Sequence, residues 1–211
     1  MNNETLLKKL IKIRDGNITL LDEVISDLKL DIKSNSIYKT TKKTKINAIK
    51  KVLDRQKDIR PVLGGYHINN RDMIEFTDSY RAYELNKIEL PFKKVVDKKD
   101  DNFDSDTMII GSYPNLDFCF KKINDIESND YTKIDIDIND ILGAFKTKES
   151  KDDLYIIDSG KDKIHLNISY LKETIDILGN NIICYGRKGN EPVYFYNEYN
   201  ETGLVLPIRT Y

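Results

Sequence analysis

The apolar and polar positions divide the chain into two stretches of a helix followed by strands, preceded by a pair of short helices. In the first thirty residues, apolar side chains recur at helical spacing in two runs. The runs are Leu6, Leu7, Leu10, Ile11 and Ile13, then Leu20, Leu21, Val24, Ile25 and Leu28. Gly16 ends the first run, and Thr19 begins the second. Residues 1–38 are therefore predicted to form a helical hairpin, whose apolar stripes must pack on the rest of the chain or on a partner.

The first stretch of helix and strands begins at residue 39. Ile46, Ile49 and Leu53 place apolar side chains on one face of a predicted helix over residues 46–57. The strand-like runs that follow cover residues 60–68, 72–78 and 80–85. Asn69 and Asn70 supply a turn between the first two runs. This part of the chain therefore predicts a helix followed by an antiparallel meander.

The second stretch repeats this order after a polar segment at residues 97–106, which is predicted to be an exposed loop. Residues 133–140 alternate like a half-buried strand, and residues 140–145 resemble a short helix. Ile168, Leu171, Ile175 and Leu178 then form the apolar face of a helix that Gly179 ends. The last predicted strands cover residues 181–186, 192–198 and 202–211. The predicted fold class is α+β, with duplicated helix-and-meander modules at residues 39–120 and 121–211.

Composition places the chain among soluble globular proteins. It has 211 residues, of which 39% are hydrophobic and 33% are charged, and its net charge is −1. Cys119 and Cys184 stand far apart in no metal-ligand spacing, and the amino terminus has no long apolar run. We therefore expect a reduced, cytoplasmic protein with no membrane partner.

The charge is unevenly distributed along the chain. Residues 39–60 carry nine Lys or Arg against two Asp, a local net charge of +7, which leaves −8 for the remainder. The apolar face of the predicted helix puts Lys43, Lys50 and Lys51 on its exposed side. These lysines are candidates for weak, sequence-independent contacts with the phosphates of duplex DNA. A merely solvated helix face is the alternative.

Residues typical of catalysis are sparse. His67 and His165 each lie in a strand-like context without a second ligand at metal spacing. The aspartates of residues 100–106 lack the Gly and Glu of a calcium loop, and the GRKGN sequence at residues 186–190 fits a hairpin turn better than a phosphate loop. We therefore expect no enzyme, no cofactor and no metal; a metal-dependent nuclease that uses the acidic clusters is the distant alternative.

Three sequence motifs resemble the bacterial sliding clamp, the processivity factor of the replicative DNA polymerase. Residues 60–85, RPVLGGYHINNRDMIEFTDSYRAYEL, resemble its Arg-Pro-x-Leu segment and its Thr-Asp-Gly-Tyr-Arg turn. Residues 167–211 open with Asn-x-x-Tyr-Leu and approach the end of the chain with Val-x-Pro-x-Arg, as the last part of a clamp does. Residues 111–118, GSYPNLDF, are similar to the connector between its second and third domains. The matches cover about half of the chain and imply a clamp-like fold.

In the clamp family, the Thr-Asp-Gly-Tyr-Arg turn and the carboxyl-terminal strand form a cleft for short linear motifs of replication proteins. The resemblance therefore implies such partners and a peptide-binding cleft in this chain. The matching residues are Arg60, Leu63, Thr77, Ser79, Tyr80, Arg81, Val205, Leu206, Pro207, Ile208 and Arg209. Leu206 and Ile208, two positions apart in a strand, are expected to face the same side. Without the resemblance, all of these residues would be read as ordinary core and turn positions.

Two departures from the clamp pattern modify this interpretation. Ser79 stands where clamps have Gly, and Ala82 stands where they have Leu, so the shape of the cleft is expected to differ. A clamp ring takes six domains, whereas 211 residues hold two shortened ones. The leading hypothesis is therefore a truncated clamp-like binding protein of DNA replication, from a phage or another mobile element. The alternative is a true processivity clamp that encircles DNA as a homo-oligomer of about three or more copies.

Overall fold

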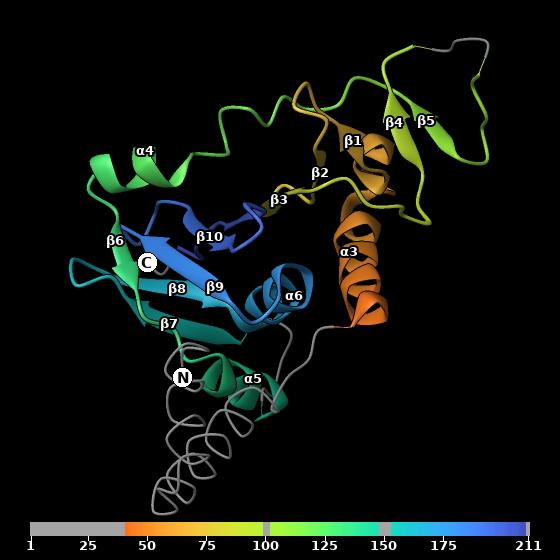
Figure 1. Cartoon of the computed structure of the whole chain (residues 1–211). Helices are drawn as coiled ribbons and strands as arrows, with labels where there is room; N and C mark the ends of the chain where they lie inside the picture. The colour runs from red at the N-terminus through yellow and green to blue at the C-terminus, as the bar shows by residue number, and fades with distance from the viewer. Residues whose placement is uncertain (1–40, 99–101, 148–152, 210–211) are drawn as a thin grey trace, which may run out of the picture. The chain divides into compact units, whose positions relative to one another are not determined.

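The computed structural model describes residues 41–98, 102–147 and 153–209. The predicted helical hairpin at residues 1–38 lies outside the described residues. The described residues form an α+β fold, shown in Figure 1, in which the strands of the main sheet are antiparallel. None of the helices described in these ranges has the length and apolarity needed to cross a membrane.

The main sheet has seven strands in the order β1-β2-β3-β11-β10-β9-β6. Their bounds are β1 His67–Ile68, β2 Ile74–Thr77, β3 Arg81–Leu85, β6 Thr132–Ile134, β9 Ile182–Gly186, β10 Val193–Asn197 and β11 Thr202–Val205. Strands β3 and β11 are far apart in the sequence yet pair with each other, with Arg81 opposite Val205 and Tyr83 opposite Gly203. Two strand pairs complete the sheets: β4 Lys94–Val96 with β5 Met108–Ile110, and β7 Leu154–Asp158 with β8 Lys163–Asn167.

Two long helices cover one face of the main sheet. Helix α3 (Lys42–Gln56) packs on α6 (Ile168–Leu178), and Figure 1 shows the two helices next to each other. The Tyr83 hydroxyl of β3 lies 2.8 Å from the Thr174 hydroxyl of α6. A Cβ atom at Gly203 would lie 3.0 Å from the Tyr83 ring and 3.1 Å from Leu178, so a larger residue there would require these side chains to shift by a few tenths of an ångström.

The opposite face of the sheet is covered by the connector, which we define as residues 111–122 between β5 and helix α4 (Ile123–Ser128). Tyr113, Leu116 and Phe120 of the connector belong to one buried cluster with Ala82, Tyr194 and Leu204 of the sheet. Burial of these apolar side chains holds the connector on the sheet. The sheet is therefore packed on both faces.

The helix predictions agree well with the structure. Lys43, Lys50 and Lys51 are exposed on α3, as expected. Helix α6 begins at its cap Asn167, whose side chain accepts hydrogen bonds from the backbone N–H groups of Ser169 and Tyr170. It ends at Gly179, whose φ of 94° is costly for other residues. The short helix expected near residues 140–145 is α5 (Ile138–Thr147).

The predicted long-range pairing is confirmed, whereas several predicted strands are too long. Residues 203–205 pair with β3, as the clamp resemblance requires. Pro61 starts a 3-10 helix, η1 (Pro61–Gly64), where the sequence predicted a strand, because proline fits the first turn of a helix. Strand β6 ends at Ile134, and the Asp137 carboxylate caps the following helix by accepting the Asn139 N–H at 2.8 Å.

The predicted division into modules at residues 39–120 and 121–211 remains a prediction. Strands from both proposed modules contribute to the one seven-stranded sheet. The polar loop at residues 97–106 joins β4 to β5, which pair in parallel, and its described residues are mostly exposed. The prediction of an exposed loop is thus confirmed for its described residues.

Candidate peptide-binding cleft

A cleft of about 360 Å³ opens beside the turn between β2 and β3. Seven of the eleven residues proposed from the sequence line it, namely Arg60, Leu63, Thr77, Ser79, Tyr80, Arg81 and Leu206. The other lining residues are Ala82, Pro114, Leu116, Phe118, Cys119, Pro192, Tyr194 and Leu204. The pairing of β3 with β11 brings the two groups of predicted residues together, because the Leu206 N–H donates to the Tyr80 carbonyl at 2.8 Å.

The β2–β3 turn is held in one shape by its own side chains. The Asp78 carboxylate accepts the backbone N–H groups of Tyr80 and Arg81, both at 3.0 Å. The Thr77 hydroxyl donates to the Arg81 carbonyl at 2.7 Å. Ser79 has a φ of 74°, in the left-handed region that favours glycine. Clamps have glycine at this position, so Ser79 keeps the turn shape at a cost in backbone strain.

A buried ion cluster lies behind the turn. We define it as Asp78, Arg81 and Glu173, whose side chains are at most 7% exposed. The Arg81 guanidinium lies 3.0 Å from the Asp78 carboxylate and also contacts Glu173 of α6. Burial alone would lower the pKa of Arg81. Its neighbours Tyr83, Asp78 and Glu173 act in the opposite direction and raise the pKa of Arg81 overall. Arg81 thus joins the cleft wall to α6 and is not free to pair with a ligand.

Aromatic rings extend the buried ion cluster to the surface. The Tyr170 ring centre lies 4.4 Å from the Arg81 guanidinium carbon and 4.6 Å from that of Arg55. Tyr80 packs near the same ring, with 6.4 Å between the ring centres. Tyr80 remains 49% exposed, so it stands at the mouth of the cleft with one side supported by Tyr170. This arrangement positions an aromatic side chain for contact with a ligand.

The floor of the cleft is apolar and its mouth exposes large apolar side chains. Leu63, Leu116 and Leu204 are buried, and Leu206 is 37% exposed. Phe118 is 87% exposed, which is unusual for so large a ring and marks the connector side of the mouth. No connector residue was among the predicted cleft residues, although residues 111–118 are similar to the clamp connector.

Four residues proposed from the sequence lie outside the cleft lining. Val205 is fully buried. Strand β11 ends there, and Pro207 cannot donate to a neighbouring strand because proline has no N–H. The Ile208 N–H donates to the His165 carbonyl at 2.8 Å, and Ile208 and Arg209 line a different hollow next to β8. The expectation that Leu206 and Ile208 share one face is therefore wrong, because the extended strand stops before them.

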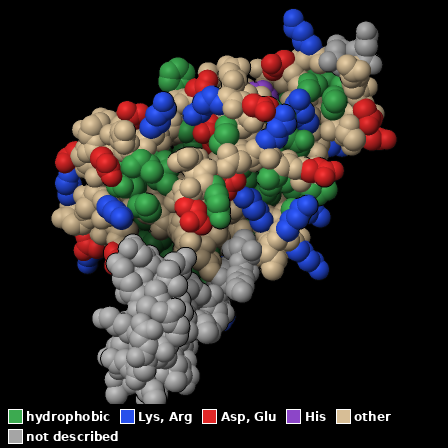
Figure 2. Space-filling model, in the orientation of Figure 1, with side chains coloured by type: hydrophobic (Ala, Val, Ile, Leu, Met, Phe, Trp, Pro, Cys, Tyr) green, Lys and Arg blue, Asp and Glu red, His purple; other side chains and the backbone are tan. Residues whose placement is uncertain are grey.

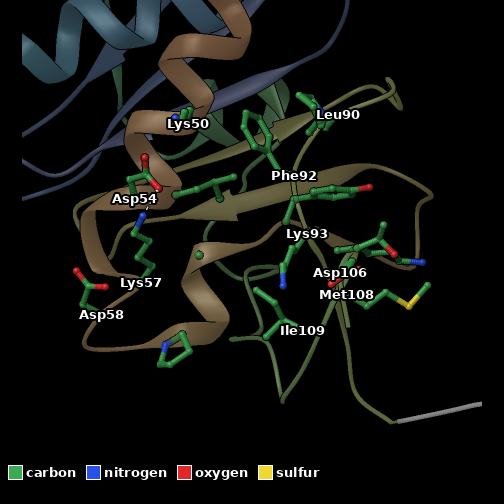
Figure 3. A pocket seen from close by; sticks show the side chains of 17 residues that line it. Lys50, Asp54, Lys57, Asp58, Leu90, Phe92, Lys93, Asp106, Met108 and Ile109 are labelled. Atoms are coloured by element: carbon green, nitrogen blue, oxygen red, sulfur yellow. Dashed lines mark hydrogen bonds and ion pairs between the residues drawn. The ribbon is translucent and has the colours of Figure 1, made fainter. Parts of the chain in front are cut away.

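The basic helix has its lysines on the surface. Figure 2 shows Lys and Arg side chains over α3. Lys51 lies 3.6 Å from Glu173, a weak ion pair with a half-exposed lysine. Lys50 stands at the edge of a hollow of about 960 Å³ between α3 and the segment before β4, shown in Figure 3. Charges of both signs line this hollow, and Lys57 pairs there with Asp54 at 2.8 Å, so it is not a simple anion site.

The described residues offer no group of three or more His, Cys, Asp or Glu that could hold a metal ion. Nδ1 of His67 lies 2.8 Å from Glu75, and its ring stacks on Tyr113 with 5.2 Å between the centres. The Tyr113 hydroxyl in turn accepts the Thr77 N–H at 3.1 Å. His67 therefore belongs to the support of the cleft wall.

Known structures identify this fold, although no family model and no curated protein sequence matches the chain. The sliding clamp of Bartonella birtlesii bound to griselimycin aligns with a TM-score of 0.57 at 12% identity, covering 80% of this chain and 64% of the clamp. The Bacillus subtilis clamp gives 0.52 at 15% identity, covering 80% and 62%. The Borrelia burgdorferi clamp, in complex with a natural product, gives 0.51 at 13% identity, covering 86% and 69%.

The chain therefore has the fold of the bacterial DNA polymerase sliding clamps and is highly divergent from them in sequence. It spans about 62–64% of the length of the Bacillus and Bartonella clamps. The resemblance stated from three short motifs is thus confirmed at the level of the fold.

Proposed function

We propose that this chain is a clamp-like protein of DNA replication that binds linear peptides of replication proteins in the cleft beside the β2–β3 turn. It acts by binding and not by catalysis, in the cytoplasm, and its gene belongs to a phage or another mobile element. The observation that carries the proposal is the joining of the Thr77–Arg81 turn to Leu206 in a lined apolar cleft. The clamp fold supports it.

The chemistry of the cleft favours a short extended peptide with Leu and Phe anchors. A cavity of about 360 Å³ has room for a few side chains, and its floor is formed by leucines and Tyr194. Exposed Tyr80 and Phe118 at the mouth can cover the anchors of a bound peptide. Binding orders a flexible peptide, so micromolar affinity is expected.

The structure provides a matched pair of variants to test this proposal. A fluorescent peptide carrying a clamp-binding motif is titrated against the wild type, Leu206→Asp and Ile208→Asp. Leu206 lines the cleft and Ile208 lines another hollow, so the same change in chemistry is made inside and outside the site. We expect saturable binding by the wild type and by Ile208→Asp, and at least a tenfold (about 1.4 kcal/mol) loss in Leu206→Asp. Equal loss in both variants, or no binding by the wild type, contradicts the proposal.

Cys119 provides a second measurement that needs no substitution in the cleft. Cys119 lines the cleft and is partly exposed, whereas Cys184 is fully buried. Burial raises the pKa of the Cys119 thiol, so alkylation is measured at mildly alkaline pH, where more thiolate is present. A bound peptide should slow the alkylation of Cys119. Alkylation at an unchanged rate with saturating peptide would place the peptide elsewhere.

The second candidate function is that of a DNA-encircling clamp built from about three or more copies. The exposure of Lys43, Lys50 and Lys51 on one helix favours it. Sedimentation across micromolar concentrations tests this candidate directly: a species of three or more chains supports it, and a monomer or dimer at all concentrations contradicts it.

A further inference from the structure

Another hollow, of about 490 Å³, lies beside residues 208–209, which follow β11. It does not share a lining residue with the peptide cleft. Asp162, Lys163, His165, Gly189, Asn190, Ile208 and Arg209 line it. These residues come from β8 and the turn before it, from the turn between β9 and β10, and from the segment after β11. The GRKGN segment, residues 186–190, forms the end of β9 and the β9–β10 turn. In the sequence, this segment fits a hairpin turn better than a phosphate loop.

Backbone hydrogen bonds fix the three walls of this hollow relative to one another. The Asp162 carboxylate accepts the Gly189 N–H at 2.7 Å. The Ser159 hydroxyl lies within 2.9 Å of the Arg187 carbonyl and donates to it. The Ile208 N–H donates to the His165 carbonyl at 2.8 Å. The hollow is therefore pre-formed, and a ligand would pay little ordering entropy.

The cationic side chains of the hollow have no carboxylate partner among the described residues. Lys163 and Arg209 are exposed and form no ion pair within residues 41–98, 102–147 and 153–209. Asp162 is the one carboxylate in the lining, and its two oxygens accept the backbone N–H groups of Lys163 and Gly189. The Asp162 carboxylate thus stabilises the turns through hydrogen bonds. Lys163 and Arg209 remain available to bind an anion.

His165 adds a hydrogen-bond donor to the hollow. Its Nδ1 atom is buried and has no hydrogen-bond partner within the described part of the chain. A buried N–H without an acceptor is costly, so in the neutral ring the proton belongs on Nε2. Nε2 is not one of the buried side-chain atoms that lack a hydrogen-bond partner, so it is the ring nitrogen that faces solvent at the hollow. The ring therefore presents an N–H donor beside two cations.

We propose that this hollow binds a phosphate group, held by Lys163, His165 and Arg209. Arginine offers a planar fork of donors, lysine a point charge and histidine a single N–H, so two walls, β8 and the segment after β11, supply donors to the several oxygens of one phosphate. The site is separate from the peptide cleft, which Leu206 lines on the other side of Pro207. The inference therefore does not depend on the proposed function.

The full chain is titrated with inorganic phosphate at constant ionic strength, with chloride as the reference anion, and binding is followed by calorimetry. We expect saturable binding in the millimolar range by the wild type. Arg209→Gln and Lys163→Gln should each weaken it about tenfold, because each removes a charge-assisted hydrogen bond. Both side chains are exposed, and an unchanged melting temperature without phosphate confirms that the variants fold.

Lys188→Gln is the control, because Lys188 is an exposed lysine of the same β9–β10 turn that does not line the hollow. Its phosphate affinity should equal that of the wild type. A parallel titration with phenyl phosphate distinguishes free phosphate from a phosphomonoester: binding of both indicates a monoester site, and binding of inorganic phosphate alone indicates a free-anion site. Absence of saturation with both ligands, or equal weakening in Lys188→Gln, overturns the proposal.

Discussion

The cleft wall and the exposed face of α3 use charge in opposite ways. Behind the cleft, the buried ion cluster of Asp78, Arg81 and Glu173 is almost completely removed from water. On α3, Lys43 and Lys50 are in contact with solvent. Charges buried in an apolar interior are costly unless each has its partner, whereas solvated charges cost almost nothing. The first region therefore depends on every member of its cluster, and the second tolerates change.

This difference separates the residues that hold the cleft together from the residues that could contact a ligand. In the sequence, Arg81 is a candidate binding residue because it matches the Thr-Asp-Gly-Tyr-Arg turn of the clamp family. In the structure its charge is used to join β3 to α6. Lys43 and Lys50 of α3, in contrast, are exposed and form no ion pair within the described residues. Loss of stability and loss of binding should therefore follow different residues.

The largest expected effect is that of Arg81→Met on stability. The change removes the buried cation of Asp78 and Glu173 and leaves them only the more exposed Arg55, 3.3 Å from Asp78, and Lys51, 3.6 Å from Glu173. The loss should lie at the lower end of about 3–5 kcal/mol of the free energy of unfolding. Urea denaturation followed by circular dichroism measures the loss. Arg60→Met, at an exposed arginine of the same cleft, should change the free energy of unfolding by less than about 0.5 kcal/mol. Similar costs for the two variants would contradict the contrast drawn above.

A triple variant separates lost charge pairing from lost packing. Arg81→Met combined with Asp78→Asn and Glu173→Gln removes all three charges of the cluster. Asparagine keeps a side-chain oxygen that can accept the turn N–H groups of Tyr80 and Arg81, which Asp78 accepts in the wild type. The triple variant should therefore be more stable than Arg81→Met alone. If it is less stable, Asp78 and Glu173 are sufficiently stabilised by Arg55 and Lys51, and the cost of Arg81→Met comes from lost packing and not from unpaired charge.

Tyr113→Phe should have a smaller effect, confined to the support of the cleft. It removes the acceptor of the Thr77 N–H, which is buried, and this should cost about 1–2 kcal/mol of the free energy of unfolding. The stacked contact with His67 is retained, since the ring remains. Tyr199→Phe, at a tyrosine 64% exposed, is the control and should be nearly neutral. A neutral Tyr113→Phe would mean that the turn holds itself without the connector.

The sequence predicted well those features that depend on local chemistry. The cap at Asn167, the stop at Gly179 and the exposed lysines of α3 follow from residue types within one or two helical turns. The order of strands around the turn was available through the motifs of residues 60–85 and 202–209. These features set the fold and seven of the eleven predicted cleft residues.

The remaining parts of the site depend on contacts between segments far apart in the sequence. No periodicity shows that Glu173 of α6 meets Arg81 of β3, or that the connector forms one side of the cleft. The placement of Ile208 and Arg209 failed for a local reason, since Pro207 ends the strand that was extended through them. The missing N–H of Pro207 already favours a sheet edge or a bend at this position, but it does not show which side chains stay in the cleft beyond it.

The smallest expected effect concerns DNA, where α3 is predicted to bind duplex weakly and without sequence preference. Replacement of Lys43, Lys50 and Lys51 by Gln should lower the slope of log affinity against log salt by about 2.7, because each phosphate contact releases condensed counterions. Replacement by Glu should abolish binding, and the Gln variant should hardly change stability, since the three lysines are exposed. The Glu variant should be less stable than the Gln variant, because Lys51→Glu sets a carboxylate beside Glu173. Fluorescence anisotropy with a labelled duplex at several salt concentrations measures the affinity and its salt slope.

The control for the DNA prediction makes the same change of charge elsewhere. Lys146, Lys161 and Lys188 are exposed and lie outside α3, so their replacement by Glu gives an equal net charge without altering the helix. If this control keeps most of the duplex affinity, the position of the charge matters and α3 is the contact surface. An unchanged salt slope in the α3 Gln variant would make α3 a solvated face only, and the contrast between the two regions would then reduce to stability alone.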